Sequence, residues 1–451
     1  MDNDSTQKRG KFSSSIGFIL SSAGAAIGLG NLWKFPYVVG YNGGGLFIIF
    51  YIMFSIILGI PITLAEMSIG RTTQLSAAAA YKKLNNKWTF VGALGVLCSL
   101  ILLFYYCVVG GWVLKYIFSY LTNQSFGTDK VQFFNNFISS TSEPIIFTLL
   151  FLIICTAIVL LGISKGIEKT SKIMLPGLFI LLFVVAIKSV TLPNASQGLN
   201  FLFAVNLNSI GSTSDILKSL AAALSQSFFS LGLGMGITVT YGSYLSKNEN
   251  MPKSSAWIAF LDIVISILSG LAILPAVFSF GFEPSSGPGL IFHTLPMVFE
   301  SIPLGNIFGL IFFLLVFFAA TTSAMASLEV ISATLIDMLK IKRHSATIIS
   351  AVVIGIMSTL VSLSNGLLEN FKIMGMNLFD LLVYFTDKLF MPLSAIFTCI
   401  FVGYIYKSKN LLKEIRLGDE NFKFSKFFDI IMKYVAPIFI FIVFIIGLTQ
   451  K

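Results

Sequence analysis

A stretch near the N-terminus places three glycines, an amide and a lysine inside an apolar run: Gly24-Ala25-Ala26-Ile27-Gly28-Leu29-Gly30-Asn31-Leu32-Trp33-Lys34-Phe35-Pro36. A membrane-spanning helix must satisfy its backbone internally, so a break at mid-depth persists only where it lines a cavity or is buried in protein. Glycine permits such a break and lets a ligand approach the backbone. The freed N–H groups then suit an anion and the freed carbonyls a cation. We therefore predict half of a binding site for a zwitterion and a small hard cation, with close helix packing through small residues as the alternative.

A second stretch of the same kind follows in the sixth apolar run: Gln226-Ser227-Phe228-Phe229-Ser230-Leu231-Gly232-Leu233-Gly234-Met235-Gly236. Paired interruptions at matching positions in two halves of a chain are typical of inverted-repeat transporters, which bind substrate near the middle of the membrane. The two coincident breaks favour a transporter over helix packing alone.

Carboxyl and hydroxyl groups inside apolar runs indicate where a cation is bound. Asp262 lies near the middle of the seventh run, where a carboxylate is costly and is by default functional. Thr321, Thr322 and Ser323 offer hydroxyls in the eighth run, although such groups often bond only to carbonyls of their own helix. Oxygen ligands of these kinds suit a hard cation. For Glu66 we favour a structural role, accepting hydrogen bonds from N–H groups freed near the first break.

The elements that must position these residues are transmembrane helices. Hydrophobic residues make up 56% of the 451 and charged residues 11%, which is typical of a polytopic membrane protein. The eleven apolar runs of spanning length centre on 14–37, 44–70, 89–121, 144–162, 169–190, 217–246, 253–282, 303–339, 346–363, 376–406 and 428–449.

Basic residues concentrate in alternate loops, and this pattern predicts orientation. The N-terminus and the loops after the second, fourth, sixth, eighth and tenth runs are rich in lysine or arginine, whereas only Lys130 and Lys372 stand out between them. The positive-inside rule then places the N-terminus in the cytoplasm and the C-terminus outside a cell inner (plasma) membrane. The net charge of +10 does not indicate nucleic-acid binding, because the basic residues fall in alternate loops, and the expected partner besides substrate is membrane lipid. The four cysteines lie far apart in apolar runs and are expected to be single buried thiols.

Two loops allow two interpretations each. The segment 283–301 combines rigid turn residues with an apolar tail, so it either folds back into an outer vestibule or is an ordinary connector. The segment 407–427 is basic and amphipathic enough to lie along an anionic membrane face, but we favour a solvated loop.

These residues carry a resemblance to a known family. Gly24 to Pro36, Asn42-Gly43-Gly44-Gly45, Gly59-Ile60-Pro61 with Glu66 and Gly70-Arg71, and the broken sixth run resemble the neurotransmitter:sodium symporter family. The resemblance extends from Arg9 to the tenth run. It implies an all-α polytopic protein of the LeuT-type fold, with two inverted five-helix repeats and discontinuous helices 1 and 6. A total of eleven helices resembles the bacterial amino-acid-transporting branch.

The resemblance implies two sodium sites. The first comprises the carbonyl of Ala26 and the side chains of Asn31, Ser230 and Asp262. Because the carboxylate of Asp262 supplies a negative charge that many family members lack at this position, we expect transport without chloride. The second site comprises the carbonyls of Gly24, Ile27 and Ala319 and the hydroxyls of Thr322 and Ser323.

The resemblance also implies how an amino acid is held. Its carboxylate meets the N–H groups of Leu29 and Gly30 and the hydroxyl of Tyr106, and its amino group faces the carbonyls of Ala26, Phe229 and Ser230. The side-chain pocket comprises Leu102, Tyr106, Phe229, Gly232, Met235, Ser323 and Ser327. This roomy, mostly apolar set resembles that of bacterial sodium-dependent tyrosine transporters, so a large hydrophobic or aromatic substrate is expected.

Charged residues at both ends of the pathway match the gates of the family, with one departure. Arg9 and Asp337 match the cytoplasmic pair. On the outer side Lys34 replaces the usual arginine, and Val383 stands where its acidic partner is usual. Either the outer pair is re-formed with Asp380, or Tyr106 and Phe229 close over the substrate in its place.

The sequence thus predicts one transporter domain over residues 1–451, with repeats at about 14–190 and 217–406 and an extra helix at about 428–449. Its expected activity is sodium-coupled symport of tyrosine or a similar amino acid by alternating access. Proton coupling, or another hydrophobic substrate such as tryptophan or leucine, is the alternative. No nucleophile or metal-hydrolase motif predicts an enzyme, and polarity at a single depth disfavours a channel.

Overall fold

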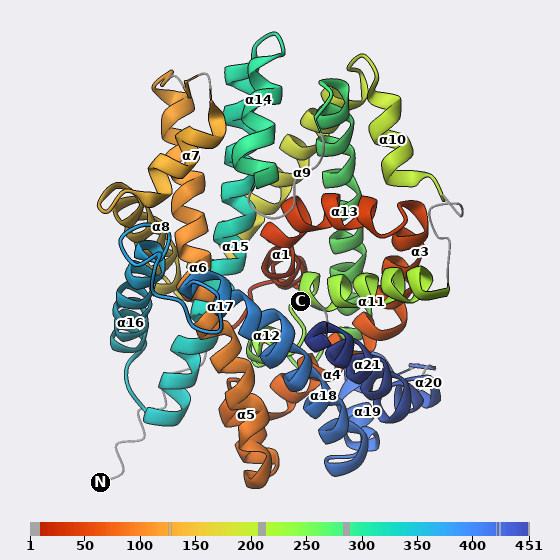
Figure 1. Ribbon diagram of the computed structural model, residues 1–451. Coiled ribbons are helices and arrows are strands. Elements are labelled where there is room, and N and C mark those ends of the chain that lie inside the picture. Colours follow the sequence, from red (N-terminus) through yellow and green to blue (C-terminus); the bar gives the residue numbers. More distant parts are fainter. Residues whose placement is uncertain are drawn as a thin grey trace.

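The computed structural model describes residues 10–124, 126–127, 129–205, 213–282, 289–420, 422–423 and 425–449. Over these ranges the chain is helical, and its one β-type pairing is an isolated bridge between Ile373 and Met376. Figure 1 shows α1 (Ser15–Ala26) near the centre of the view, with longer helices around it. The first glycine-rich stretch therefore lies inside the helix bundle.

Nine helices of the described residues are long and apolar enough to cross a membrane, and the bent pair Ser15–Ala26 and Gly30–Tyr41 adds a tenth. The sixth expected run is divided between two helices, the second of which is short. The all-helical membrane architecture is confirmed, whereas the exact number of eleven crossings stays a prediction.

The helices of the first half include three short ones outside the spans, α5, α7 and α10. The bounds are α1 Ser15–Ala26, α2 Phe35–Tyr41, α3 Gly45–Phe54, α4 Ile60–Thr73, α5 Ala77–Leu84, α6 Thr89–Leu121, α7 Lys130–Ser139, α8 Glu143–Leu160, α9 Lys169–Val190 and α10 Ala195–Phe203.

The second half contains the longest helix, α15, and ends in short helices near the C-terminus. The bounds are α11 Thr213–Ser230, α12 Ile237–Gly242, α13 Met251–Ser279, α14 Leu295–Glu300, α15 Gly305–Leu339, α16 Arg343–Leu363, α17 Leu378–Tyr384, α18 Met391–Ile400, α19 Ser408–Arg416, α20 Ser425–Ile430 and α21 Ala436–Thr449.

Wide, π-helical turns interrupt several spans just before a proline. They occupy Gly30–Lys34, Ser55–Gly59, Leu290–Thr294, Phe385–Phe390 and Ile431–Val435, each ending two residues before a proline. Proline has no N–H to donate, and its ring collides with the carbonyl four residues earlier. The preceding turn therefore widens, and such turns are frequent at functional sites.

A buried arginine joins three segments at the end of the bundle expected to face the cytoplasm. Arg71 of α4 is fully buried and donates to Glu414 Oε1 of α19 at 2.9 Å and to the carbonyl of Glu249 at 2.7 Å. Lys247 Nζ lies 2.9 Å from the same Glu414 oxygen. The segment 407–427 is therefore not a simple solvated loop, because residues 408–416 form a helix docked on α4 through a buried ion pair.

Candidate binding site at two helix breaks

The first break interrupts the N-terminal span at its glycines. Helix α1 ends at Ala26, and Ile27 has an extended backbone (φ −75°, ψ 97°) before the chain resumes as a wide turn at Gly30. The axes on either side differ by 55°. The freed N–H of Gly28 donates to Asn31 Oδ1 at 3.1 Å, and that of Leu29 to Tyr106 Oη at 3.2 Å. A Cβ at Gly28 would lie 2.8 Å from both Tyr106 Oη and Ser323 Oγ, so only glycine fits.

The second break separates α11 from α12. The three alternating glycines have positive φ values: 63° at Gly232, 78° at Gly234 and 73° at Gly236. L-residues with side chains rarely adopt this region, which explains why glycine occupies these positions. Ser99 Oγ donates to the freed carbonyl of Met235 at 2.7 Å. Both predicted interruptions are therefore present.

Glu66 binds the second break. Its Oε1 accepts the N–H of Gly234 at 2.9 Å, and the side chain is buried. The expected role as an acceptor for freed backbone groups fits this contact, but the expected location near the first break is wrong. The reason is that α4 packs against α12, which brings Glu66 to the second glycine stretch.

A buried polar cluster surrounds Asp262 of α13. Its Oδ1 accepts from Asn31 Nδ2 at 2.8 Å and from Ser230 Oγ at 2.6 Å, and its Oδ2 accepts from Tyr51 Oη at 2.7 Å. Ser266 Oγ lies 2.8 Å from Asn31 Nδ2 and 3.0 Å from Tyr51 Oη. The cluster thus joins four segments around the carboxylate, which is hydrogen-bonded as a buried charge must be.

Two members of this cluster, Tyr51 and Ser266, were not predicted. Ser266 lies four residues after Asp262 and therefore on the same face of its helix, a spacing visible in the sequence. Tyr51 lies in a different span, and no spacing in the sequence links it to Asp262.

A second cluster forms where α15 passes the first break. Ser323 Oγ lies 3.4 Å from the carbonyl oxygen of Gly24 and 3.3 Å from that of Ile27. Thr322 Oγ1 lies 3.1 Å from the carbonyl oxygen of Ala319 in its own helix, as hydroxyls in helices often do. The structure therefore brings together the five residues predicted for a second sodium, with Ser323 making the contact between the helices.

A small cavity of about 30 Å³ lies between the two breaks. All predicted substrate residues except Ser230 line it, and Ser230 faces Asp262 instead. The lining residues are Ala25, Ala26, Gly28, Leu29, Gly30, Asn31, Leu102, Tyr106, Phe229, Gly232, Met235, Ile237, Ser323 and Ser327.

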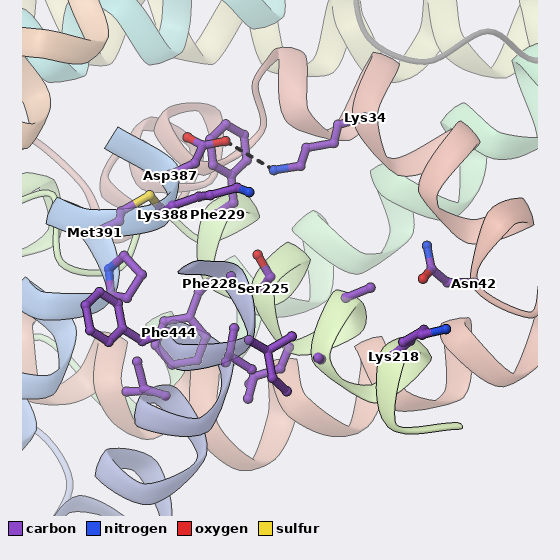
Figure 2. Close-up of a pocket in the computed structure, with 18 residues that line it drawn as sticks. Lys34, Asn42, Lys218, Ser225, Phe228, Phe229, Asp387, Lys388, Met391 and Phe444 are labelled. Carbon is purple, nitrogen blue, oxygen red and sulfur yellow. Dashed lines mark hydrogen bonds and ion pairs between the residues drawn. The ribbon is translucent and has the colours of Figure 1, made fainter. Parts of the chain in front are cut away.

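Phe229 and Lys34 cover one side of this cavity. A Cβ at Gly30 would lie 2.3 Å from the Phe229 ring, so the ring rests directly on the backbone of the first break. Lys34 Nζ sits 4.3 Å from the centre of that ring and 3.3 Å from Asp387 Oδ2. Figure 2 shows Lys34 and Asp387 pointing toward one another beside Phe229. Beyond them lies a larger cavity of about 580 Å³ with Phe228 and Phe444 in its walls.

The predicted partner of Lys34 therefore needs correction. Asp387 forms the ion pair, whereas Asp380 makes no ion pair within the described residues, and its N–H donates to Asn377 Oδ1 at 2.8 Å. The aromatic alternative is present as well, since Phe229 covers the cavity beneath the ion pair.

Near the C-terminal end of α15, Asp337 Oδ2 accepts the N–H of Ser76 at 2.6 Å. Its predicted partner Arg9 lies outside the described residues. Phe12 packs edge-on against Phe18 and Tyr241, with ring centres 5.3 and 5.6 Å apart. Phe12, which precedes α1, therefore packs against α12, the helix after the second break.

Comparison with known proteins decides the family. The model of the sodium:neurotransmitter symporter family matches residues 9–136 and 124–451, nearly the entire chain. The chain belongs to this symporter family. An uncharacterized sodium-dependent transporter of Bacillus subtilis is 36% identical to the symporter over 98% of both chains. The human sodium- and chloride-dependent GABA transporter 2 is 27% identical over 92% of this chain and 76% of its own.

The structure of the symporter is similar to the crystal structure of MhsT in complex with L-phenylalanine. The TM-score is 0.89 at 39% sequence identity, covering 97% of this chain and all of the other. The chain therefore has the LeuT-type fold with discontinuous first and sixth helices, and it is a multi-pass, sodium-dependent membrane symporter and not an enzyme.

Proposed function

We propose that this symporter imports a large hydrophobic or aromatic amino acid, with tyrosine preferred, by alternating access and without chloride. The observation that carries the proposal is the cavity between the two breaks, which has a carboxylate cluster on one side and a hydroxyl–carbonyl cluster on the other. An amino acid is a zwitterion, and freed N–H and carbonyl groups offer complementary partners for both of its charges.

The backbone of the substrate would bind at the first break. Leu29 N–H and Tyr106 Oη, which now bond to each other at 3.2 Å, and the N–H of Gly30 would hold the carboxylate. Carbonyls of Ala26, Phe229 and Ser230 would hold the amino group. The Leu29–Tyr106 hydrogen bond supports this assignment, because an entering carboxylate can accept from both donors.

The side chain of the substrate would extend past Gly232 between Leu102 and Met235. A Cβ at Gly232 would find its nearest heavy atoms at 3.7 and 3.9 Å, so unfilled space adjoins this position. Ser327 also lines the cavity, and its hydroxyl, which is assigned to neither the carboxylate nor the sodium ions, favours a polar tip such as that of tyrosine. The phenylalanine bound to MhsT supports an aromatic side chain.

Entry of such a substrate would require the walls to separate. The cavity of about 30 Å³ equals roughly the volume of one water molecule in the liquid. Phe229 would swing off Gly30, and Lys34, which lies over the ring, would move with it or release it. Alternating access would therefore begin at the Lys34 side.

Sodium would bind in both clusters. At the first, Asp262, Ser230 and the Ala26 carbonyl would coordinate the ion with Asn31, whose amide must turn its oxygen from the N–H of Gly28 toward the ion. At the second, the ion would replace the weak contacts of Ser323 with Gly24 and Ile27, joined by Ala319 and Thr322. The negative charge of Asp262 offsets the charge of the first ion, which supports chloride independence.

We also propose how the chain is oriented in the membrane and how it is divided into repeats. The lysine-rich loops support an N-terminus in the cytoplasm and a C-terminus outside the inner membrane. Residues 1–451 would form one transporter domain, with repeats at about 14–190 and 217–406, an extra helix at about 428–449 and an outer loop at about 283–301. Residues 283–288 of that loop lie outside the described residues.

Uptake by purified protein in proteoliposomes tests the proposal. Labelled tyrosine is expected to accumulate with an inward sodium gradient and in gluconate as well as chloride, and to be displaced by phenylalanine and tryptophan better than by alanine. Accumulation driven by a proton gradient without sodium would overturn sodium coupling. Displacement by small amino acids alone would overturn the aromatic substrate.

A further inference from the structure

A third cavity, of about 560 Å³, lies where the last two spans meet the short helices α19 and α20. In Figure 1 these helices form a group at the lower right, away from α1. We propose that this cavity binds the phosphate group of an anionic phospholipid in the cytoplasmic leaflet. Its lining is Gly403, Tyr404, Lys407, Ser408, Lys409, Leu412, Ser425, Lys426, Asp429, Lys433 and Tyr434.

The charge of the lining points to an anion. It contains four lysines and one aspartate, a net charge of +3. Lys433 is paired with Asp429 at 2.8 Å, which neutralises one lysine. Within the described part of the chain, Lys407, Lys409 and Lys426 form no ion pair. Like charges gathered around one hollow repel each other, and an anion between them relieves that repulsion.

Backbone and hydroxyl donors lie in the same cavity. Lys407 has a φ of 66°, which turns the chain so that the nine-residue helix α19 begins at Ser408 with no side-chain cap. The first N–H groups of a helix lack intrahelical partners and favour an anion. Ser408 is 1% exposed, and its Oγ, which lies beside Asp429, makes no hydrogen bond of regular geometry among the described residues. A phosphate oxygen would accept from both kinds of donor.

The surroundings of the cavity suit a lipid better than free phosphate. Tyr404 and Tyr434, which line it, are 48% and 56% exposed, and tyrosine is enriched where protein meets the membrane–water interface. Exposed apolar side chains continue from there along the last span, namely Ile430, Ile438, Phe441 and Ile445. An acyl chain would pack on this surface while the headgroup occupies the lysines. The leaflet follows from the proposed orientation, on which this inference rests.

Occupancy of the cavity would also hold α19 in place. The opposite side of this helix carries Glu414, which is bound to the buried Arg71 of α4. Leu411 and Ile415 of α19 are fully buried. A headgroup at the N-terminus of α19 would therefore stabilise the contact between this helix and α4.

Native mass spectrometry of the full-length protein, titrated with phosphatidylglycerol, tests the inference. The variant Lys407→Gln/Lys409→Gln/Lys426→Gln is compared with Lys82→Gln/Lys253→Gln/Lys340→Gln, which removes the same charge from exposed cytoplasmic lysines outside the cavity. We expect affinity to fall by about fivefold for each cavity lysine removed. The control variant should bind like the wild type.

Three results would overturn the inference: equal affinity in both variants, equal binding of phosphatidylcholine, or displacement of the lipid by inorganic phosphate at similar concentration. The last would identify free phosphate as the ligand. If the triple variant does not fold, the single variants Lys409→Gln and Lys426→Gln, each expected to lose about fivefold, replace it. Sodium-driven uptake by each variant, measured separately, distinguishes a lost lipid site from a lost transport site.

Discussion

Asn31 Nδ2 and Asp262 Oδ1, which are 231 residues apart in the chain, lie 2.8 Å apart in a fully buried cluster. The contact joins the first helix break to the seventh span. It places the only negative charge of this cluster beside the carbonyls and amides freed by the break.

Replacing Asp262 by asparagine should make uptake depend on chloride. The substitution removes the negative charge but leaves the hydroxyls of Tyr51, Ser230 and Ser266, which can donate to an anion. We expect uptake in gluconate to fall at least about tenfold, or 1.4 kcal/mol, and chloride to restore part of it. Glu369→Gln, which neutralises an exposed carboxylate, is the control. Full activity of the Asp262 variant in gluconate would show that chloride-independent uptake does not depend on the negative charge of Asp262.

Replacing Ser323 by alanine should weaken sodium binding at the second cluster. The hydroxyl bridges α15 to the carbonyls of Gly24 and Ile27. Loss of one such oxygen ligand, worth about 1 kcal/mol, should raise the half-saturating sodium concentration about fivefold. Ser332→Ala removes a buried hydroxyl of the same helix that has no partner among the described residues, so its sodium dependence should not change. Equal effects of the two substitutions would argue against a sodium site here.

Replacing Gly28 by alanine should reduce transport strongly without unfolding the protein. The added methyl group would lie 2.8 Å from both Tyr106 Oη and Ser323 Oγ and would push these side chains apart. Overpacking of this kind costs about 1–3 kcal/mol, so uptake should fall about tenfold or more. Gly447→Ala, whose added carbon meets nothing within 4 Å, is the matched substitution in the last helix. Normal uptake by Gly28→Ala would mean that the break opens wider than the structure indicates.

Replacing Asp387 by asparagine should loosen the cover over the small cavity. The ion pair with Lys34 is partly exposed, with side chains 22% and 21% accessible, so its contribution is at most about 1 kcal/mol. We expect thiol labelling of Ser327→Cys, which lines the small cavity beneath the cover, to become up to about fivefold faster. The four native cysteines are buried and give low background. Asp380→Asn should leave the labelling rate unchanged. Faster labelling in Asp380→Asn than in Asp387→Asn would instead identify Asp380 as the partner of Lys34.

Replacing Glu66 by alanine should destabilise the protein more than replacing it by glutamine. Alanine leaves the buried N–H of Gly234 without its acceptor, at a cost of about 1–3 kcal/mol, whereas glutamine retains an oxygen. Thermal unfolding in detergent, followed by intrinsic fluorescence, measures the difference. Equal melting temperatures for the two variants would show that this hydrogen bond does not support the second break.

Both breaks could be predicted from the sequence because alternating glycines weaken a helix at the very depth where lipid leaves no other partner for the backbone. The partner of Lys34 could not, since a regular helix places Asp380 and Asp387 on the same face as Val383. The wide turn Phe385–Phe390, which precedes Pro392 and contains Asp387, changes that register. Pro392, two residues after this wide turn, is the one sign of the changed register that the sequence itself contains.

The contacts of Glu66 and Asp262 depend on packing between spans far apart in the chain. Their positions in apolar runs predict that both carboxyl groups lie inside the membrane. The sequence does not predict that α4 packs against α12 or that Tyr51 contacts α13, because tertiary structure determines both contacts. By contrast, Leu411 and Ile415 are four residues apart and both buried, as expected for an amphipathic helix. The helix at residues 408–416 could therefore have been predicted from the sequence.

One peptide unit, between Ile27 and Gly28, belongs to both clusters. Its carbonyl lies 3.3 Å from Ser323 Oγ, and its N–H lies 3.1 Å from Asn31 Oδ1. A peptide bond is planar, so the carbonyl of Ile27 and the N–H of Gly28 rotate together as one rigid group. An ion that tilts the carbonyl toward itself must swing the amide hydrogen away from Asn31, and the reverse holds too. The shared plane would couple the two proposed sodium positions directly through one peptide unit, without a larger conformational change.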